Sequence, residues 1–122
     1  MRSILLFVDD LYEDFELWYP KIRMEEAGLK AVIAGPTAGT TYQGKHGYPC
    51  KADVALDSID SHAFAGLVIP GGFAPDKLRR IPKVLEIVRQ MFERIQGARA
   101  EGQFLFMRPG AVRYPDLHFK TN

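Results

Sequence analysis

Residues 4–8 read ILLFV and are followed by Asp9 and Asp10. Five apolar residues in succession are typical of a strand that is buried on both faces, as parallel strands are when helices cover both sides of a sheet. Residues 29–34 (LKAVIA) and 66–69 (GLVI) are similarly apolar, and a Gly-Pro or Pro-Gly pair ends each of them. These three runs predict the core strands of a parallel sheet.

The segment after the first strand predicts a helix. Residues 14–27 carry Phe15, Trp18 and Ile22 at helical spacing, and we expect this stripe to face the core. Pro20 lies inside the segment, so a kink or a broken first turn is expected there.

A second long helix is expected from Pro82, which suits the first helical position. Its apolar residues repeat at i, i+4, i+7 and i+11: Val84, Val88, Met91 and Ile95. Residues 37–60 are rich in glycine and predict an irregular excursion with short strands. The apolar run at 104–106 (FLF) is interpreted as a fourth parallel strand. This alternation predicts an α/β fold, a parallel sheet with helices on both faces.

Length and composition limit the classes of function. A chain of 122 residues suits a single domain over residues 1–122. Sixteen basic and fifteen acidic residues give a net charge of +1, which argues against a strongly charged nucleic-acid or membrane-surface binder. The single cysteine, Cys50, excludes an internal disulfide framework, and we expect it to be a small buried residue rather than a reactive thiol. We therefore expect a cytoplasmic protein with no nucleic-acid and no membrane partner.

Ligands of parallel α/β sheets bind beyond the carboxyl ends of the strands, which directs attention to Glu13, Gly71 and Gly72. Glu13 is either an acid or base that faces the strand ends or a carboxylate that caps the helix. The two glycines allow backbone N–H groups to approach a ligand, as an oxyanion site requires, although such a pair also forms ordinary tight turns. His46 has no cysteine or carboxylate pair at ligand spacing, so no metal is expected.

Three motifs occur here in an order that resembles the PfpI family: residues 13–20 (EDFELWYP), 44–48 (GKHGY) and 67–76 (LVIPGGFAPD). The resemblance covers roughly residues 2–96, and three spaced motifs together are more specific than any one of them. The family belongs to the class I glutamine-amidotransferase-like superfamily and is described variously as intracellular cysteine peptidases, deglycases and glyoxalases. The resemblance implies a flavodoxin-like three-layer sandwich. It also implies cysteine-dependent hydrolysis or deglycation of small carbonyl-derived or peptide substrates, with no cofactor.

The resemblance further implies roles for individual residues. Glu13 matches the carboxylate that hydrogen-bonds the cysteine nucleophile, and Gly72, with Gly71 beside it, matches the backbone oxyanion donor. Asp76 matches a carboxylate that in some members reaches a histidine of a neighbouring subunit, so a homo-oligomer that uses this region is expected. A thiolate needs a positioned partner and its adduct needs backbone donors, so Glu13 and Gly72 are expected to lie near one another.

The sequence departs from the family at the nucleophile. Family chains follow the second long helix with a strand and a sharp elbow that usually carries Cys-His. Here residues 102–110 read GQFLFMRPG, with Met107 or Arg108 where the cysteine is expected. Because a thioether cannot be deprotonated into a nucleophile, the chain is expected to be inactive. We interpret residues 97–122 as the divergent tail of a C-terminally truncated, deleted or frame-shifted family member.

Two alternatives remain from the sequence. The first strand followed by Asp9 and Asp10 is similar to a response-regulator receiver, in which paired aspartates bind magnesium and a third, here Asp57, accepts a phosphoryl group. No suitable lysine accompanies them, and Arg108 stands at the expected position. The other alternative is a non-catalytic α/β module that binds a partner or forms an oligomer.

Overall fold

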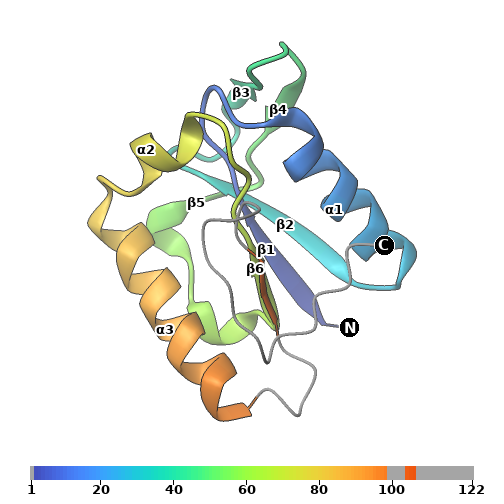
Figure 1. Ribbon diagram of the computed structural model, residues 1–122. Coiled ribbons are helices and arrows are strands. Elements are labelled where there is room, and N and C mark those ends of the chain that lie inside the picture. The colour runs from blue at the N-terminus through green and yellow to red at the C-terminus, as the bar shows by residue number, and fades with distance from the viewer. Residues whose placement is uncertain (1, 99–103, 107–122) are drawn as a thin grey trace.

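A parallel five-stranded sheet forms the centre of the molecule. The computed structural model describes residues 2–98 and 104–106, and the strands of the sheet follow the order β5-β2-β1-β6-β7 (Figure 1). The strands are β1 (Ser3–Phe7), β2 (Lys30–Gly35), β5 (Val54–Ala55), β6 (Gly66–Val68) and β7 (Phe104–Phe106). Every neighbouring pair in this sheet is parallel. The flavodoxin-like α/β class expected from the sequence is therefore confirmed.

Helices cover both faces of the sheet. Helix α1 (Asp14–Glu26) lies on one side, while α2 (Ala74–Leu78) and α3 (Pro82–Ala98) lie on the other (Figure 1). A separate antiparallel hairpin, β3 (Thr41–Gln43) with β4 (Pro49–Lys51), stands near the start of α1. This arrangement gives three layers, with the hairpin added beyond one end of the sheet.

The first strand is buried as its sequence predicted. The side chains of residues 4–8 expose none of their surface, because β1 lies between β2 and β6 in the sheet and between the two helix layers. Residues 104–106 pair in parallel with β6, which confirms the fourth strand. The short strand β5 adds a fifth at the opposite edge, beside β2. Helix α2 was not predicted from the sequence.

The expected core face of α1 is wrong for Phe15 and Ile22, whereas Trp18 is partly buried and packs against the core. Phe15 is 78% exposed and Ile22 is 50% exposed, whereas Leu17 and Pro20 are buried. Leu17, Pro20 and Met24 form a second apolar stripe at i, i+3 and i+7, and this stripe packs on the core. Apolar residues surround the first turns of this helix, so periodicity alone does not decide which stripe faces inward. The helix continues through Pro20 without a break.

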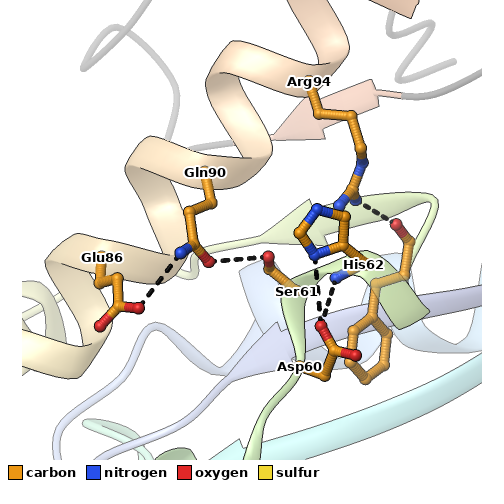
Figure 2. A network of polar contacts seen from close by, with 7 residues as sticks. Asp60, Ser61, His62, Glu86, Gln90 and Arg94 are labelled. Atoms are coloured by element: carbon orange, nitrogen blue, oxygen red, sulfur yellow. Dashed lines mark hydrogen bonds and ion pairs between the residues drawn. The ribbon is translucent and has the colours of Figure 1, made fainter.

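A polar network ties α3 to the segment that precedes β6 (Figure 2). The buried hydroxyl of Ser61 donates to Gln90 Oε1 (2.9 Å), and Gln90 Nε2 donates to Glu86 Oε1 (3.1 Å). Arg94 Nη2 donates to the carbonyl of Phe64 at 2.5 Å. These contacts fix the helix against the strand whose other end carries the Pro-Gly-Gly turn.

No helix among the residues that the structure describes is long and apolar enough to cross a membrane.

Replacing Ser61 with alanine is expected to lower the free energy of unfolding by about 1 kcal/mol, because a buried hydrogen bond is lost and Gln90 Oε1 is left without its donor. Urea denaturation of the purified variant measures this change. Ser58→Ala removes an exposed hydroxyl that bonds Ala55 O, and is expected to change stability by about 0.5 kcal/mol or less. Equal losses in the two variants would contradict the structural role of the network.

Candidate active site

Three loops meet beyond the carboxyl ends of β1 and β6. Leu11 N donates to Gln43 O at 2.7 Å, which joins the loop after β1 to the hairpin. Phe73 N donates to Leu11 O (2.9 Å) and Glu13 N donates to Gly71 O (3.0 Å), which join the same loop to the turn after β6. Leu11 has a φ of 67°, a left-handed conformation that is uncommon for leucine and that these bonds hold in place.

The buried carboxylate of Asp14 anchors the hairpin to the start of α1. Its Oδ1 accepts from His46 N and its Oδ2 accepts from Tyr48 N, both at 3.0 Å. Burial works to raise the pKa of Asp14, but these two backbone donors hold it below its ordinary value. A Cβ at Gly44 would overlap this carboxylate, so the loop needs a glycine there to approach so closely. Asp14 was not singled out from the sequence.

Aromatic side chains support the same contact. The hydroxyl of Tyr12 donates to Tyr48 O at 2.6 Å and accepts from Trp18 Nε1 at 3.2 Å. The rings of Trp18 and Tyr48 meet edge to face, with centroids 5.3 Å apart. Burial raises the pKa of Tyr12 to about 12, so its hydroxyl stays protonated and remains a donor. The hairpin loop is therefore held by both polar and aromatic contacts.

Glu13 is largely buried beside the side chains of Lys45 and His46 in the hairpin loop. Its Oε2 lies 2.8 Å from Lys45 Nζ and 3.9 Å from His46 Nε2, and its side chain is 17% exposed. Glu13 occupies the N-cap position of α1, and its carboxylate is paired with Lys45 instead of making a well-formed capping hydrogen bond, although the backbone N–H of Phe15 also acts to lower its pKa. The Lys45 ammonium holds the pKa of the Glu13 carboxyl below its ordinary value, although burial opposes this effect.

A second carboxylate, Glu16, reaches the glycine turn. Its Oε1 accepts from Gly71 N at 2.7 Å. The N–H of Gly71 is therefore already bonded. Of the two glycines expected to offer a free N–H to an oxyanion, only Gly72 remains a candidate. Sequence analysis missed Glu16; its place three residues after the N-cap Glu13, as in a capping box, is the signal that could have drawn attention to it.

Gly72 lies directly against the loop that carries Glu13. It has a φ of 81°, and a Cβ built on it would lie 2.6 Å from Leu11 O and 2.8 Å from Glu13 N. In the described part of the chain, no acceptor is bonded to the N–H of Gly72. The expected proximity of the two segments is thus observed, and catalytic roles for Glu13 and Gly72 stay predictions.

Two other candidates lie apart from this cluster. The Asp76 carboxylate, 64% exposed on α2, pairs with Arg79 at 3.5 Å, and no contact among the described residues joins it to Glu13. Cys50 is buried on β4, as expected, and burial raises the pKa of its thiol to about 11. A thiol in that state is a poor nucleophile at neutral pH.

The charged cluster has ligand atoms at cation-binding distances but little free charge. One ligand atom from each of Glu13, Asp14 and His46 lies within 4.8 Å of the others. However, Lys45 already neutralises Glu13, and both Asp14 oxygens accept backbone donors. The arrangement favours a set of carboxylates that accept hydrogen bonds, with Glu13 paired to Lys45, over a metal centre.

Comparison with known proteins agrees with this geometry. The sequence profile described as the DJ-1/PfpI family matches residues 2–102. The chain belongs to the DJ-1/PfpI family. It is 42% identical over 90 residues to deglycase PfpI of Pyrococcus furiosus and 40% identical over 90 residues to deglycase PH1704 of Pyrococcus horikoshii. Each match covers 74% of this chain and 54% of the relative, so the chain spans about half the length of these curated relatives.

Solved structures of DJ-1/PfpI-type proteins share the fold. A two-domain protein of Anabaena variabilis, with a DJ-1/ThiJ/PfpI-like and a ferritin-like domain, superposes with a TM-score of 0.74 at 29% identity, over 88% of this chain and 29% of the other. Oxidised DJ-1 of Toxoplasma gondii gives a TM-score of 0.71 at 18% identity, over 88% of this chain and 55% of the other. The second likeness shows the fold alone.

The DJ-1/PfpI membership and the topology leave the receiver alternative without support. Asp57 follows β5 at the sheet edge, and β2 separates that strand from β1. The aspartates after β1 serve the loop instead, since Asp9 Oδ1 accepts from Asp10 N and Asp10 Oδ1 accepts from Gln43 N. The three residues therefore do not form one phosphoacceptor site.

Gly72→Ala is expected to lower the free energy of unfolding by about 3 kcal/mol, for two reasons. The added Cβ would overlap backbone atoms of Leu11 and Glu13, and alanine is strained at the positive φ of this position. Gly47→Ala is the matched control: it has a φ of 88° but open space around its Cβ, so only the backbone term of about 1 kcal/mol is expected. Thermal and urea unfolding measure both variants. Similar losses would show that the loops do not approach as closely as described.

Proposed function

We propose that this DJ-1/PfpI family member retains the acceptor and oxyanion-donor parts of a cysteine-hydrolase or deglycase site but does not itself carry out thiol-dependent turnover. The observation that supports this is the place of its only cysteine. Cys50 is buried on the hairpin with a raised pKa, whereas the residues that follow β7 in the sequence, where the resemblance places the family nucleophile, are Met107 and Arg108.

The parts around the glycine turn fit the resemblance. The N–H of Gly72 has no acceptor among the described residues, the Glu16 carboxylate accepts from Gly71 N, and the backbone N of Glu13 lies close to Gly72. Backbone donors of this kind stabilise a developing oxyanion, and carboxylates of this kind accept a proton or orient a thiol. In this proposal Glu16 is the carboxylate at the turn, Glu13 is the ion-paired one, and the substrate class is a small carbonyl-derived or peptide compound.

The location and organisation of the protein are part of the same proposal. A domain with a single cysteine, and therefore without an internal disulfide, suits the reducing cytoplasm. Cysteine-dependent hydrolysis or deglycation needs no cofactor, so none is proposed. Asp76, exposed beside Arg79, remains the candidate for contact with a neighbouring subunit.

The purified chain is expected to show no turnover of methylglyoxal, of glyoxal-modified amines or of peptides above the uncatalysed rate, because the only thiol in the sequence, Cys50, is buried and its pKa is raised to about 11. Deglycase PfpI of Pyrococcus furiosus serves as the positive control in the same assays. Turnover by this chain that iodoacetamide abolishes, or that Cys50→Ala removes, would overturn the proposal. Thiol-independent turnover would equally contradict an inactive site.

A second candidate function, a non-catalytic module that self-associates, is favoured by a specific observation on α1. Phe15, Tyr19 and Ile22 lie at i, i+4 and i+7, and all three are at least half exposed. A contiguous apolar stripe on a helix that faces away from the core is typical of an interaction surface.

In sedimentation velocity experiments at tens of micromolar, the wild-type chain is expected to form a homo-oligomer, and Tyr19→Glu is expected to shift it toward the monomer by placing a charge in the stripe. Leu85→Glu is the control, since Leu85 is 55% exposed on α3, outside the stripe, and its substitution is expected to leave association unchanged. A monomeric wild-type chain would contradict the oligomer.

A further inference from the structure

Three carboxylates lie at the start of α1, Glu13 at the N-cap and Asp14 and Glu16 in the first turn, and each has a different partner. Asp14 accepts two backbone N–H groups of the hairpin loop, Glu16 accepts the N–H of Gly71, and Glu13 pairs with the ammonium of Lys45. Only the Glu13 partner is a side chain that carries a full positive charge. The partner of the Glu13 carboxylate, Lys45, can therefore be substituted without removing a backbone hydrogen bond.

Lys45 is presented by a fixed loop rather than by a mobile surface segment. Its backbone N donates to Tyr12 O at 2.9 Å, and Gly44 N donates to Tyr48 O at 2.9 Å. The Asp14 carboxylate holds the backbone on the other side of Lys45, through His46 and Tyr48. Exposed ion pairs contribute little when both side chains must be ordered, but here the loop is already ordered and one partner is largely buried.

We propose that Lys45 is a positioning residue of the site: its ammonium holds the Glu13 carboxylate in place and in its anionic form, on the loop whose backbone packs against Gly72. Glu13 then acts as a hydrogen-bond or proton acceptor and not as a donor. This inference rests on the proposed function in one respect, because it takes Glu13 to be a residue of the site.

The charges around Glu13 favour a cation at the position of Lys45. Glu13, Glu16 and Asp14 all act to raise the pKa of Lys45, whereas Lys45 and, to a smaller extent, His46 act to lower the pKa of Glu13. The turn at residues 70–73, which packs on the other side, has no ionisable side chain. His46 is exposed and 3.9 Å away, and it adds positive charge only when protonated. Lys45 is therefore the neighbour of Glu13 that carries its positive charge throughout the neutral pH range.

The pKa shifts agree in direction. The hydrogen bond and charge of Lys45 lower the pKa of Glu13, and the same pair raises the pKa of Lys45. A carboxyl whose folded pKa is lowered contributes stability above its unfolded pKa, and that contribution is lost as the pH falls through the folded value. Loss of Lys45 therefore moves the titration of Glu13 upward and removes this contribution.

The test is a carbon-detected NMR titration of the glutamate side-chain carboxyls in the intact chain, with the Glu13 signal assigned through Glu13→Gln. Lys45→Met is expected to raise the pKa of Glu13, and Lys45→Arg, which keeps the charge, is expected to hold it low. Lys51→Met is the matched control, because it removes one lysine charge from β4 of the same hairpin and is expected to leave the Glu13 titration unchanged. The amide spectra of all variants report whether the loops keep their places.

An unchanged Glu13 titration in Lys45→Met would overturn the inference, and so would an equal upward shift in Lys51→Met, which would indicate a general charge effect. Lys45→Gln gives the same comparison if Lys45→Met does not fold. The titration needs no turnover, so its outcome is independent of the activity assays. A chain that proves active refutes the proposed function and leaves the role of Lys45 to be decided by the NMR result.

Discussion

The carboxylate of Asp14 is the contact on which the arrangement of the site depends. A buried anion is tolerated only when donors replace the water it has lost, and Asp14 obtains two of them from the backbone of one loop, at His46 and Tyr48. The loop can come this close because Gly44 has no Cβ. By fixing His46 and Tyr48, which follow Lys45 in the same loop, this single side chain also helps to decide where the cation beside Glu13 stands.

The sheet brings the other half of the site to the same place. β1 and β6 are parallel neighbours, so the loop with Glu13 and the turn with Gly71 and Gly72 both follow the carboxyl ends of their strands, at the same end of the sheet. The two backbones then run so close that a bridge forms between Tyr12 and Gly72. The left-handed conformation of Leu11 is the local cost of this route, and the bonds from Leu11 to both neighbouring segments offset it.

Much of the fold could be predicted from the sequence because the decisive segments carry unambiguous patterns. Five successive apolar residues at 4–8, ended by two aspartates, are typical of a strand buried on both faces. Pro82 begins a helix whose inward stripe includes the buried Val84 and Met91. Helix α1 could not be oriented in the same way. Apolar side chains lie on several of its faces, and the choice between the stripe of Phe15 and that of Leu17 is made by packing against the sheet rather than by the helix itself.

The candidate site was accessible from the sequence only in part. Three motifs indicated Glu13 and the glycine turn, because their residue types and order are those of the family. The contacts of Glu16 with Gly71 and of Lys45 with Glu13 join residues 55 and 32 positions apart, and no local pattern predicts which side chain of a motif reaches across such a distance. The motif at residues 44–48 drew attention through its histidine, whereas the structure gives the shorter contact to the lysine beside it.

The partners of these carboxylates also bear on whether the site, under the proposed function, depends on a nucleophilic cysteine for its geometry. Each contact that shapes the site is made between residues of the three loops: Asp14 with the hairpin, Glu16 with Gly71, and Glu13 with Lys45. None of them requires a thiol as donor or acceptor. Loss of a cysteine after β7 would therefore leave no buried charge without a partner in this cluster, and the selection that maintains the fold would also maintain the geometry of the site.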